Sequence, residues 1–315
     1  MKTWKKTLIL FLIMACAIGF TYYDANYISP RNYTVRNEDL HSTLIPEQLD
    51  NMNIIFFSDV EYGKFMDETR LNKLVDTINS LGPDVILFGG DLYEDTISPT
   101  GDMNHIIASA FQKLKASYGK FAVYGDNDNK TEEALNATNE IYRQADFEVL
   151  SNTSISLHKG GSQSITLVGL DNGINNTQDI QTAYLNVSKN NYVITLCHDP
   201  DTADLVPADL TNYFLAGHTH GGQVYYLFGA LYTPSSAINY FRGKQLIKEE
   251  FTLDITNGTG TTIQDMRLLA NAEIVDYHLI RDIPEEKKDS QKLKTNKHVP
   301  NKKTEQPDSS GKGAQ

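Results

Sequence analysis

The chain has little cysteine, little tryptophan and too few basic residues to balance its acids. Among 315 residues, two are Cys and one is Trp. Cys16 lies in an apolar run and Cys197 lies far along the chain, so the sequence is not that of a small disulfide-stapled fold. Lys and Arg number 28 against 40 Asp and Glu, a net charge of −12, which lacks the basic footprint of a nucleic-acid binder. We therefore expect no nucleic-acid partner.

Long apolar runs are also scarce, and the main one lies at the N-terminus. Lys2, Lys5 and Lys6 precede an apolar run from Thr7 to Tyr23. At about 1.5 Å per residue this run covers about 25 Å, slightly less than the ~30 Å hydrocarbon slab of a membrane. Lysines before the run and none just after it favour a cytoplasmic N-terminus. The sequence thus predicts a single-pass protein of the cell membrane with an extracytoplasmic domain.

Residues 1–23 are open to three interpretations at this stage. They can be an uncleaved membrane anchor, or a secretory signal that is removed after export. The run from Ile13 to Cys16 loosely resembles a bacterial lipoprotein cleavage box, which would leave a lipidated Cys16. We expect the anchor, and the other two interpretations remain as alternatives.

The rest of the chain divides into a lead-in, a domain and a tail. Residues 24–50 are interpreted as a linker and lead-in, and residues 51–284 as the folded domain. After Pro284 the sequence has almost no large apolar residues, so residues 285–315 cannot offset the entropy of ordering and should be disordered. Within the domain, short apolar runs alternate with amphipathic stretches, which predicts an α/β fold. The predicted strands are 52–57, 85–88, 121–124, 165–170, 192–196 and 213–216, and the clearest helical stripes are 71–81 and 106–114.

Polar side chains that can bind a metal follow five of these apolar runs within a few residues. Ligands of α/β sheets collect at the carboxyl ends of strands, so we expect these side chains to lie together. Oxygen and imidazole ligands without thiolate suit manganese, iron, zinc or magnesium rather than a structural zinc knot. The candidates are Asp59, Glu61, Asp91, Asp126, His198, His218 and His220.

The order of these motifs resembles that of the calcineurin-like metallophosphoesterases, from about Asn53 to Leu279. The most specific part is Gly217 to Gln223, which reads Gly-His-Thr-His-Gly-Gly-Gln, the form found in a membrane-associated bacterial branch. The ending from Gly258 to Val275 is similar to that branch as well. The resemblance implies a four-layer fold, with two facing mixed β-sheets flanked by helices.

The resemblance also implies a site for two divalent metal ions. The first ion would be held by Asp59, Glu61 and His220, and the second by Asp126, His198 and His218, with Asp91 bridging them. In such sites the metal pair clamps phosphoryl oxygens and lowers the pKa of a water that attacks phosphorus in line. The implied activity is hydrolysis of a phosphodiester or pyrophosphate bond.

Three positions depart from the family pattern. Glu61 stands where His is usual, Asp126 where Asn is usual, and Asn127 where many members have a His that assists the leaving group. Four carboxylates would neutralise two divalent cations, which favours Mn²⁺, with Mg²⁺, Fe²⁺ and Zn²⁺ as alternatives. Asn127 can orient a phosphate oxygen but cannot protonate an alkoxide, so we expect attenuated or shifted activity.

Two functions remain in competition. The first is a membrane-anchored, metal-dependent phosphoesterase whose substrate is a phosphate-containing small molecule or a lipid-linked phosphate. The second is a degenerate, non-catalytic metal-binding or scaffold module of the same fold at the cell envelope. Aromatic residues between Tyr225 and Phe241 could face lipid or pack against the domain, and the sequence does not specify an oligomeric state.

Overall fold

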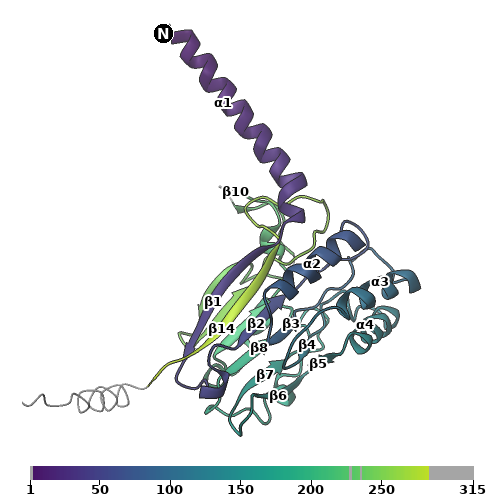
Figure 1. The fold of residues 1–315 in the computed structure, drawn as a ribbon, viewed down its shortest axis with the longest axis vertical. Coiled ribbons are helices and arrows are strands. Elements are labelled where there is room, and N and C mark those ends of the chain that lie inside the picture. The colour runs from purple at the N-terminus through teal and green to yellow at the C-terminus, as the bar shows by residue number, and fades with distance from the viewer. Residues whose placement is uncertain (1–2, 227–228, 235, 284–315) are drawn as a thin grey trace, which may run out of the picture. The chain divides into compact units, whose positions relative to one another are not determined.

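Two six-stranded mixed sheets form the core of the computed structural model, which describes residues 3–226, 229–234 and 236–283 (Figure 1). The first sheet has the order β1 (Thr34–Ser42), β14 (Glu273–Arg281), β2 (Asn53–Phe57), β3 (Val85–Phe88), β4 (Lys120–Ala122) and β5 (Phe147–Val149). The second has the order β12 (Gly243–Ile247), β13 (Phe251–Ile255), β9 (Tyr213–Ala216), β8 (Val193–Leu196), β7 (Ser164–Gly169) and β6 (Thr153–His158). Pairing is parallel except at β14–β2, β12–β13 and β6–β7.

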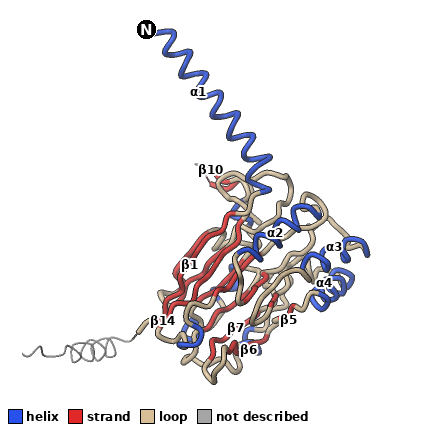
Figure 2. The backbone as a smooth tube through the Cα atoms, in the orientation of Figure 1, coloured by secondary structure: helices blue, strands red, loops and turns tan. Residues whose placement is uncertain are grey.

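Helices cover the outer faces of both sheets (Figure 2). The first sheet carries α2 (Glu68–Ser80), α3 (Gly101–Phe111) and α4 (Glu132–Gln144). The second carries the shorter elements α5 (Ile180–Ala183), η4 (Pro200–Asp204) and η5 (Ala208–Leu210). The predicted helical stripes correspond to α2 and α3. Side-chain caps start the helices, as where Asp67 accepts from the backbone N–H of Arg70 at 2.8 Å.

The alternation of β2 shows how the layers form. Its side chains point to opposite faces in turn. Ile54 and Phe56 are buried between the two sheets together with Ile194 of β8, whereas Ile55 and Phe57 pack under the helices. Because both faces are covered, the strand reads as a continuous apolar run. The predicted four-layer α/β fold is confirmed.

The N-terminal segment is helical. α1 spans Thr3–Tyr23 with no buried residue, followed by the short turns η1 (Asp24–Ile28) and η2 (Ser29–Arg31). Among the described residues, one helical stretch, Thr3–Arg31, is long and apolar enough to cross a membrane. The predicted disordered tail, 285–315, lies outside the described residues.

The structure differs from the sequence expectation for residues 24–50. Instead of a linker, this segment contains β1, which pairs in parallel with β14 along its whole length, and η3 (Glu47–Leu49). β1 is an edge strand and only Leu40 in it is buried. Edge strands carry polar residues that discourage pairing with other chains, so the segment lacks the apolar pattern of a central strand. The domain therefore begins before residue 51.

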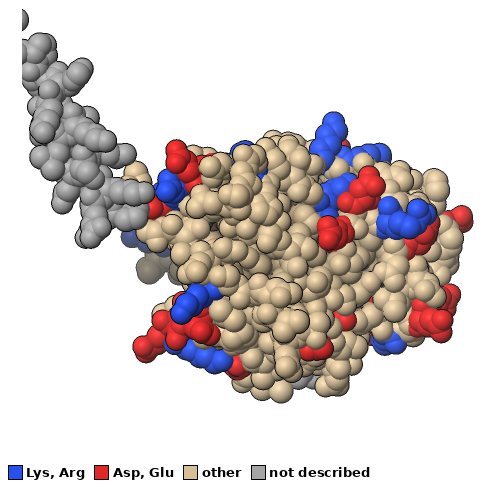
Figure 3. All heavy atoms as spheres, turned by 90° about the horizontal axis from the view of Figure 1, so that it is seen from below, with Lys and Arg blue, Asp and Glu red and all other residues tan. Residues whose placement is uncertain are grey.

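The surface carries charges of both signs. On the face shown in Figure 3, acidic and basic side chains are interspersed around a broad area that carries neither. Mixed charges of this kind are typical of a solvated surface.

Candidate metal centre

All seven candidate ligands come from loops at the carboxyl ends of parallel strands. Those from the first sheet are Asp59 and Glu61 after β2, Asp91 after β3 and Asp126 after β4, and those from the second are His198 after β8, and His218 and His220 after β9. The two sheets face each other, so their strand ends bring the loops to one place. The structure therefore brings together every residue that the sequence nominated as a metal ligand.

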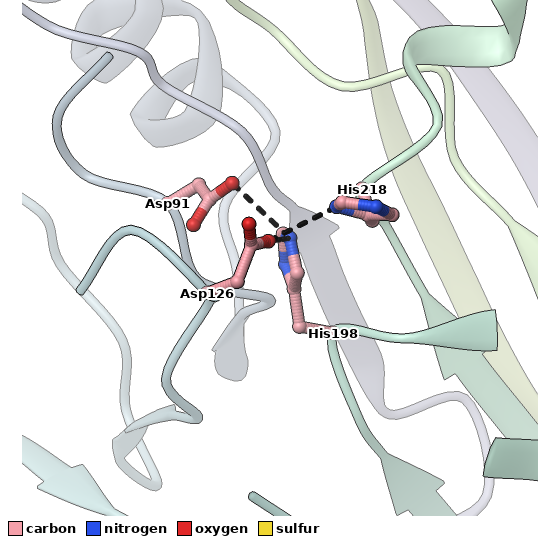
Figure 4. Close-up of side chains that lie close together, drawn as sticks. All are labelled: Asp91, Asp126, His198 and His218. Carbon is pink, nitrogen blue, oxygen red and sulfur yellow. Dashed lines mark ion pairs between the residues drawn. The ribbon is translucent and has the colours of Figure 1, made fainter. Parts of the chain in front are cut away.

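The first group of ligands consists of Asp91, Asp126, His198 and His218, whose ligand atoms all lie within 4.8 Å of one another (Figure 4). His198 Nε2 lies 3.2 Å from Asp91 Oδ2 and 3.2 Å from Asp126 Oδ1. His218 Nδ1 lies 3.0 Å from the same Asp126 oxygen. Both imidazoles thus point at one carboxylate, as the dashed lines in Figure 4 show.

The second group consists of Asp59, Glu61 and His220, again with ligand atoms within 4.8 Å of one another. His220 Nε2 lies 3.3 Å from Glu61 Oε1 and 3.8 Å from Asp59 Oδ1. His198 Nε2 of the first group is 3.9 Å from the same Asp59 oxygen, so the two groups adjoin.

The chemistry of these atoms fits divalent cations. His198 Nδ1 is 2.7 Å from the carbonyl oxygen of Gly89, which can only accept, so Nδ1 carries the N–H. The other ring nitrogen, Nε2, therefore faces the carboxylates and is free to bind a cation or a proton. His198 Nε2, Asp59 Oδ2 and Glu61 Oε2 are buried without a hydrogen-bond partner. Buried acceptors without a partner are costly unless a proton or a cation binds them. Carboxylates and an imidazole held by a backbone carbonyl are what a protein site for such cations uses.

Protons compete for the same atoms. Burial, with the nearby carboxylates of Asp91 and Asp59, raises the pKa of Glu61 well above its usual value. Burial also raises the pKa of Asp91 to about 7. Burial opposes protonation of His198, but the charges of Asp91 and Asp126 outweigh it and raise the pKa of His198. The cluster therefore takes up either protons or metal cations to balance its charge.

The backbone at the ligands is strained. Five of the seven residues have a left-handed conformation, with φ of 55° at Asp59, 55° at Glu61, 59° at Asp91, 71° at His218 and 51° at His220. For residues with a side chain this region costs roughly 1–2 kcal/mol each. Hydrogen bonds between neighbouring loops hold it, as where Asp59 N donates to Gly90 O at 2.9 Å. Strain that persists in this way clusters at functional sites.

Two motif glycines allow the ligands to approach the backbone. A Cβ at Gly125 would lie 2.0 Å from Asp91 Oδ1, and a Cβ at Gly217 would lie 2.6 Å from Asp59 Oδ2. Both distances are shorter than any real contact, so a side chain at either position would displace a ligand.

Asn127 and Asp128 hold the Asp91 loop in place. The Asn127 backbone N–H donates to Asp91 Oδ1 at 3.0 Å, and its side-chain amide donates to Asp91 Oδ2 at 3.3 Å. Asp128 is fully buried and accepts from the backbone N–H groups of Asp91 at 2.8 Å, Leu92 at 2.9 Å and Gly125 at 2.8 Å. Its carboxylate therefore joins the loop after β3 to the loop after β4.

Two further residues contact the ligands and were not nominated from the sequence. Ser236 Oγ is 2.7 Å from His218 Nε2, which orients that ring. Arg267 is fully buried, and its guanidinium donates to the carbonyl oxygens of Gly258, Ala270 and His220 at 3.2, 2.7 and 3.5 Å. Ser236 has no sequence signal, because its loop follows a path set by the tertiary fold, whereas Arg267 lies in the ending from Gly258 to Val275 that resembles the bacterial branch.

Five of the seven candidate ligands line a cleft of about 340 Å³, namely Glu61, Asp91, Asp126, His218 and His220. Its lining also includes side chains outside the set of ligand candidates that could contact a substrate. Besides metal-ligand candidates, the cleft is lined by Lys64, Glu94, Asp95, Thr96, Asn127, Ile174, Tyr232, Pro234, Ser236, Thr262 and Ile263.

Comparison with known proteins finds a matching family profile, similar sequences and a similar solved structure. The sequence profile of the calcineurin-like phosphoesterase family matches residues 52–222. The chain is 27% identical over 266 residues to the uncharacterized metallophosphoesterase YkuE of Bacillus subtilis, covering 84% of this chain and 92% of that protein. It is 25% identical to a zebrafish (Danio rerio) transmembrane protein with metallophosphoesterase domain, covering 75% of this chain and 54% of the relative. The crystal structure of the calcineurin-like phosphoesterase YfkN from Bacillus subtilis matches with a TM-score of 0.40 and 12% identity, over 78% of this chain and 96% of that one.

Proposed function

Because the chain belongs to the calcineurin-like phosphoesterase family, we propose that it is a membrane-anchored hydrolase that cleaves a phosphodiester or pyrophosphate bond using two divalent cations. The observation that carries this proposal is the convergence of two adjoining sets of ligand atoms, each within 4.8 Å, of which five residues line one cleft. The zebrafish relative is named as a transmembrane protein, and α1 is apolar and unburied, which supports the anchor.

The proposal assigns the ligands to two cations. Asp59, Glu61 and His220 hold one, and Asp126, His198 and His218 hold the other. Asp91 lies with Asp126, His198 and His218, and it would be shared by the two cations. Two such cations supply polarisation of the phosphoryl oxygens and a low-pKa water as nucleophile. Since four carboxylates balance two divalent charges, and oxygen donors prefer hard ions, Mn²⁺ is the cation we propose.

The chain's own residues position the reacting groups. Asn127 holds both oxygens of the Asp91 carboxylate, which keeps that side chain in place between the two sets. Its amide cannot release a proton to a departing alkoxide, so the site should favour substrates whose leaving group needs little protonation. We place this domain outside the cytoplasm, since the lysines precede α1.

The test measures metal content and turnover on the same preparation. The full chain is purified in detergent without chelator, its bound metal is measured, and hydrolysis of bis(p-nitrophenyl) phosphate is followed in Mn²⁺. We expect turnover, and a loss of about 10²-fold or more for Asp91→Asn, since removing one positioned catalytic group typically costs that much. Asp39→Asn, at a carboxylate exposed by 61% on β1, is the matched control.

One outcome would replace this proposal. Bound metal without turnover above that of free Mn²⁺, under each of several divalent metals, would identify the chain as a non-catalytic metal-binding module of the same fold.

A further inference from the structure

The metal centre lies at the end of the first sheet where the chain enters from α1. β1 begins at Thr34, which pairs with Glu273 at the start of β14. β2 runs antiparallel to β14, with Phe56 opposite Val275, so the carboxyl end of β2 lies beside the start of β14 (Figure 1). The loop with Asp59 leaves from this end. The ligands and the segment that follows α1 thus share one end of the sheet.

The segment after α1 is attached to the loop that supports the ligands. The carbonyl oxygen of Ala25 accepts from the backbone N–H of Arg267 at 2.9 Å, and Arg31 forms an ion pair with Asp265 at 2.6 Å. The Arg267 guanidinium in turn donates to the carbonyl oxygen of His220. Ala25 directly follows Asp24, the first residue beyond α1, and such a stretch of chain spans less than about 10 Å. A membrane that holds α1 therefore lies close to this loop.

Exposed apolar side chains lie at the cleft and on the loops beside it. We call Leu231, Tyr232, Ile263 and Leu269 the apolar rim; they are exposed by 63%, 37%, 54% and 63%. Tyr232 and Ile263 also line the cleft. Exposed apolar side chains grouped on adjoining loops indicate an interaction site, whereas singly scattered exposed leucines do not.

Hydrogen bonds join the three loops that carry the apolar rim. Leu231 N donates to Val224 O at 2.8 Å, and Tyr225 N donates to Leu268 O at 2.8 Å, next to Leu269. The backbone N–H of Thr262 donates to the side-chain oxygen of Gln223 at 3.0 Å, which brings Ile263 to the same surface. The small hairpin β10 (Tyr225–Tyr226) and β11 (Gly229–Ala230) belongs to this group, because Tyr225 begins β10 and Leu231 follows β11.

A cation and an aromatic ring accompany the apolar rim. Arg242 donates to the carbonyl oxygen of Leu269, and its guanidinium lies 4.3 Å from the ring centroid of Tyr225. Arginine and aromatic residues beside exposed leucines are the composition that suits the lipid headgroup region.

We propose that the apolar rim inserts into the headgroup region of the bilayer that holds α1, and that the cleft takes the phosphate of a membrane lipid. The headgroup region adds roughly 5–8 Å to each side of the hydrocarbon slab. This thickness is comparable to the length of chain from the end of α1 to Ala25, which binds the Arg267 loop. Leu269 lies two residues from Arg267, whose backbone N–H binds Ala25 just after α1. This proximity to the anchor favours a lipid surface over a protein partner. The substrate half of this inference rests on the proposed hydrolysis, and the docking half rests on the proposed membrane anchor.

Fluorescence quenching tests the docking surface without using activity. In a Trp4→Phe background, which removes the one native tryptophan, Leu231→Trp and Leu269→Trp are each introduced into the full chain. The protein is reconstituted into phosphatidylcholine vesicles whose acyl chains are brominated near the carbonyl. We expect at least about twofold quenching at both positions, because a side chain in the interface contacts the first acyl carbons.

Leu246→Trp is the matched control. Leu246 is exposed by 65%, and it pairs with Thr252, which pairs with Tyr213 at the start of β9. It therefore lies at the end of the second sheet opposite the metal ligands. Equal quenching at Leu246→Trp and at the rim, or no quenching at either, would overturn the docking surface.

Two substrates with the same leaving group test whether the cleft takes the phosphate of a membrane lipid. Hexadecyl p-nitrophenyl phosphate in the vesicles is compared with water-soluble methyl p-nitrophenyl phosphate, in Mn²⁺. For the double variant Leu231→Ser/Leu269→Ser we expect kcat/KM to fall at least about fivefold more for the hexadecyl ester than for the methyl ester, since only the former uses the interface.

The outcomes separate this inference from the proposed function. Selective quenching with hydrolysis of neither ester would support the docking surface and contradict the phosphoesterase. Hydrolysis of both esters with equal loss in the double variant would support the phosphoesterase and overturn the lipid substrate.

Discussion

Single residues determine what the metal centre can bind. Sequence reasoning could nominate Asp59, Asp91 and His198 because each follows an apolar run, and strand ends are where ligands gather. It could not find Ser236, which orients His218 from a loop without regular pattern. Nor could it show that the Asn127 amide is bound to Asp91, because that contact depends on how two loops meet.

Metal affinity should depend on pH through Asp91. Burial raises the pKa of this carboxyl to about 7, so below that pH it holds a proton that a metal must displace. We expect the affinity for Mn²⁺ to rise from pH 6 to pH 8, by up to about tenfold per pH unit for each proton released. Isothermal titration of the full chain in buffers of different ionisation enthalpy measures both the affinity and the protons. A constant affinity with no proton release would contradict the assignment of Asp91 as a ligand.

Asn127→His should restore a general acid at the cleft. A positioned acid contributes about 10²- to 10⁴-fold where the leaving group is poor and less where it is good. The backbone N–H of residue 127 still holds Asp91 in this variant, since that bond does not need the side chain. We expect turnover of an alkyl phosphodiester to rise more than turnover of bis(p-nitrophenyl) phosphate. An equal change for both would show that the missing acid does not limit the rate.

At the scale of elements, burial on both faces makes a strand visible in the sequence. β2, β3, β8 and β9 are covered on both sides and read as continuous apolar runs. β1 is an edge strand with a polar sequence, and its pairing with β14 depends on residues more than two hundred positions away. The conformations of the loops after the strands also depend on residues distant in the sequence, so they could not be predicted. Their left-handed turns are held by neighbouring loops and not by local sequence.

Asp128→Ala tests how firmly the loops after β3 and β4 are joined. The variant leaves three buried backbone N–H groups, those of Asp91, Leu92 and Gly125, without their acceptor. We expect a loss of about 3 kcal/mol in the free energy of unfolding of the metal-free chain, measured by urea titration. Asp95→Ala is the control, because Asp95 is exposed by 56% and pairs with an exposed Lys130. Equal losses for the two variants would contradict the structural role of Asp128.

At the scale of the whole molecule, the proposed orientation follows from α1. Three lysines precede the apolar run and none follows directly, which predicts that everything after Tyr23 lies outside the cytoplasm. A reporter that is active only outside the cytoplasm, fused after Lys287, should therefore be active. A cytoplasmic reporter at the same position should be silent, and activity of that second fusion would reverse the orientation.

The claim on which the account depends is that seven side chains from five loops share two divalent cations. The most direct measurement is anomalous diffraction from crystals of the full chain grown with Mn²⁺. The account predicts two anomalous peaks, one among Asp59, Glu61 and His220 and one among Asp126, His198 and His218, with Asp91 contacting both. Peaks elsewhere, or Mn²⁺-saturated crystals without a peak at these residues, would contradict it.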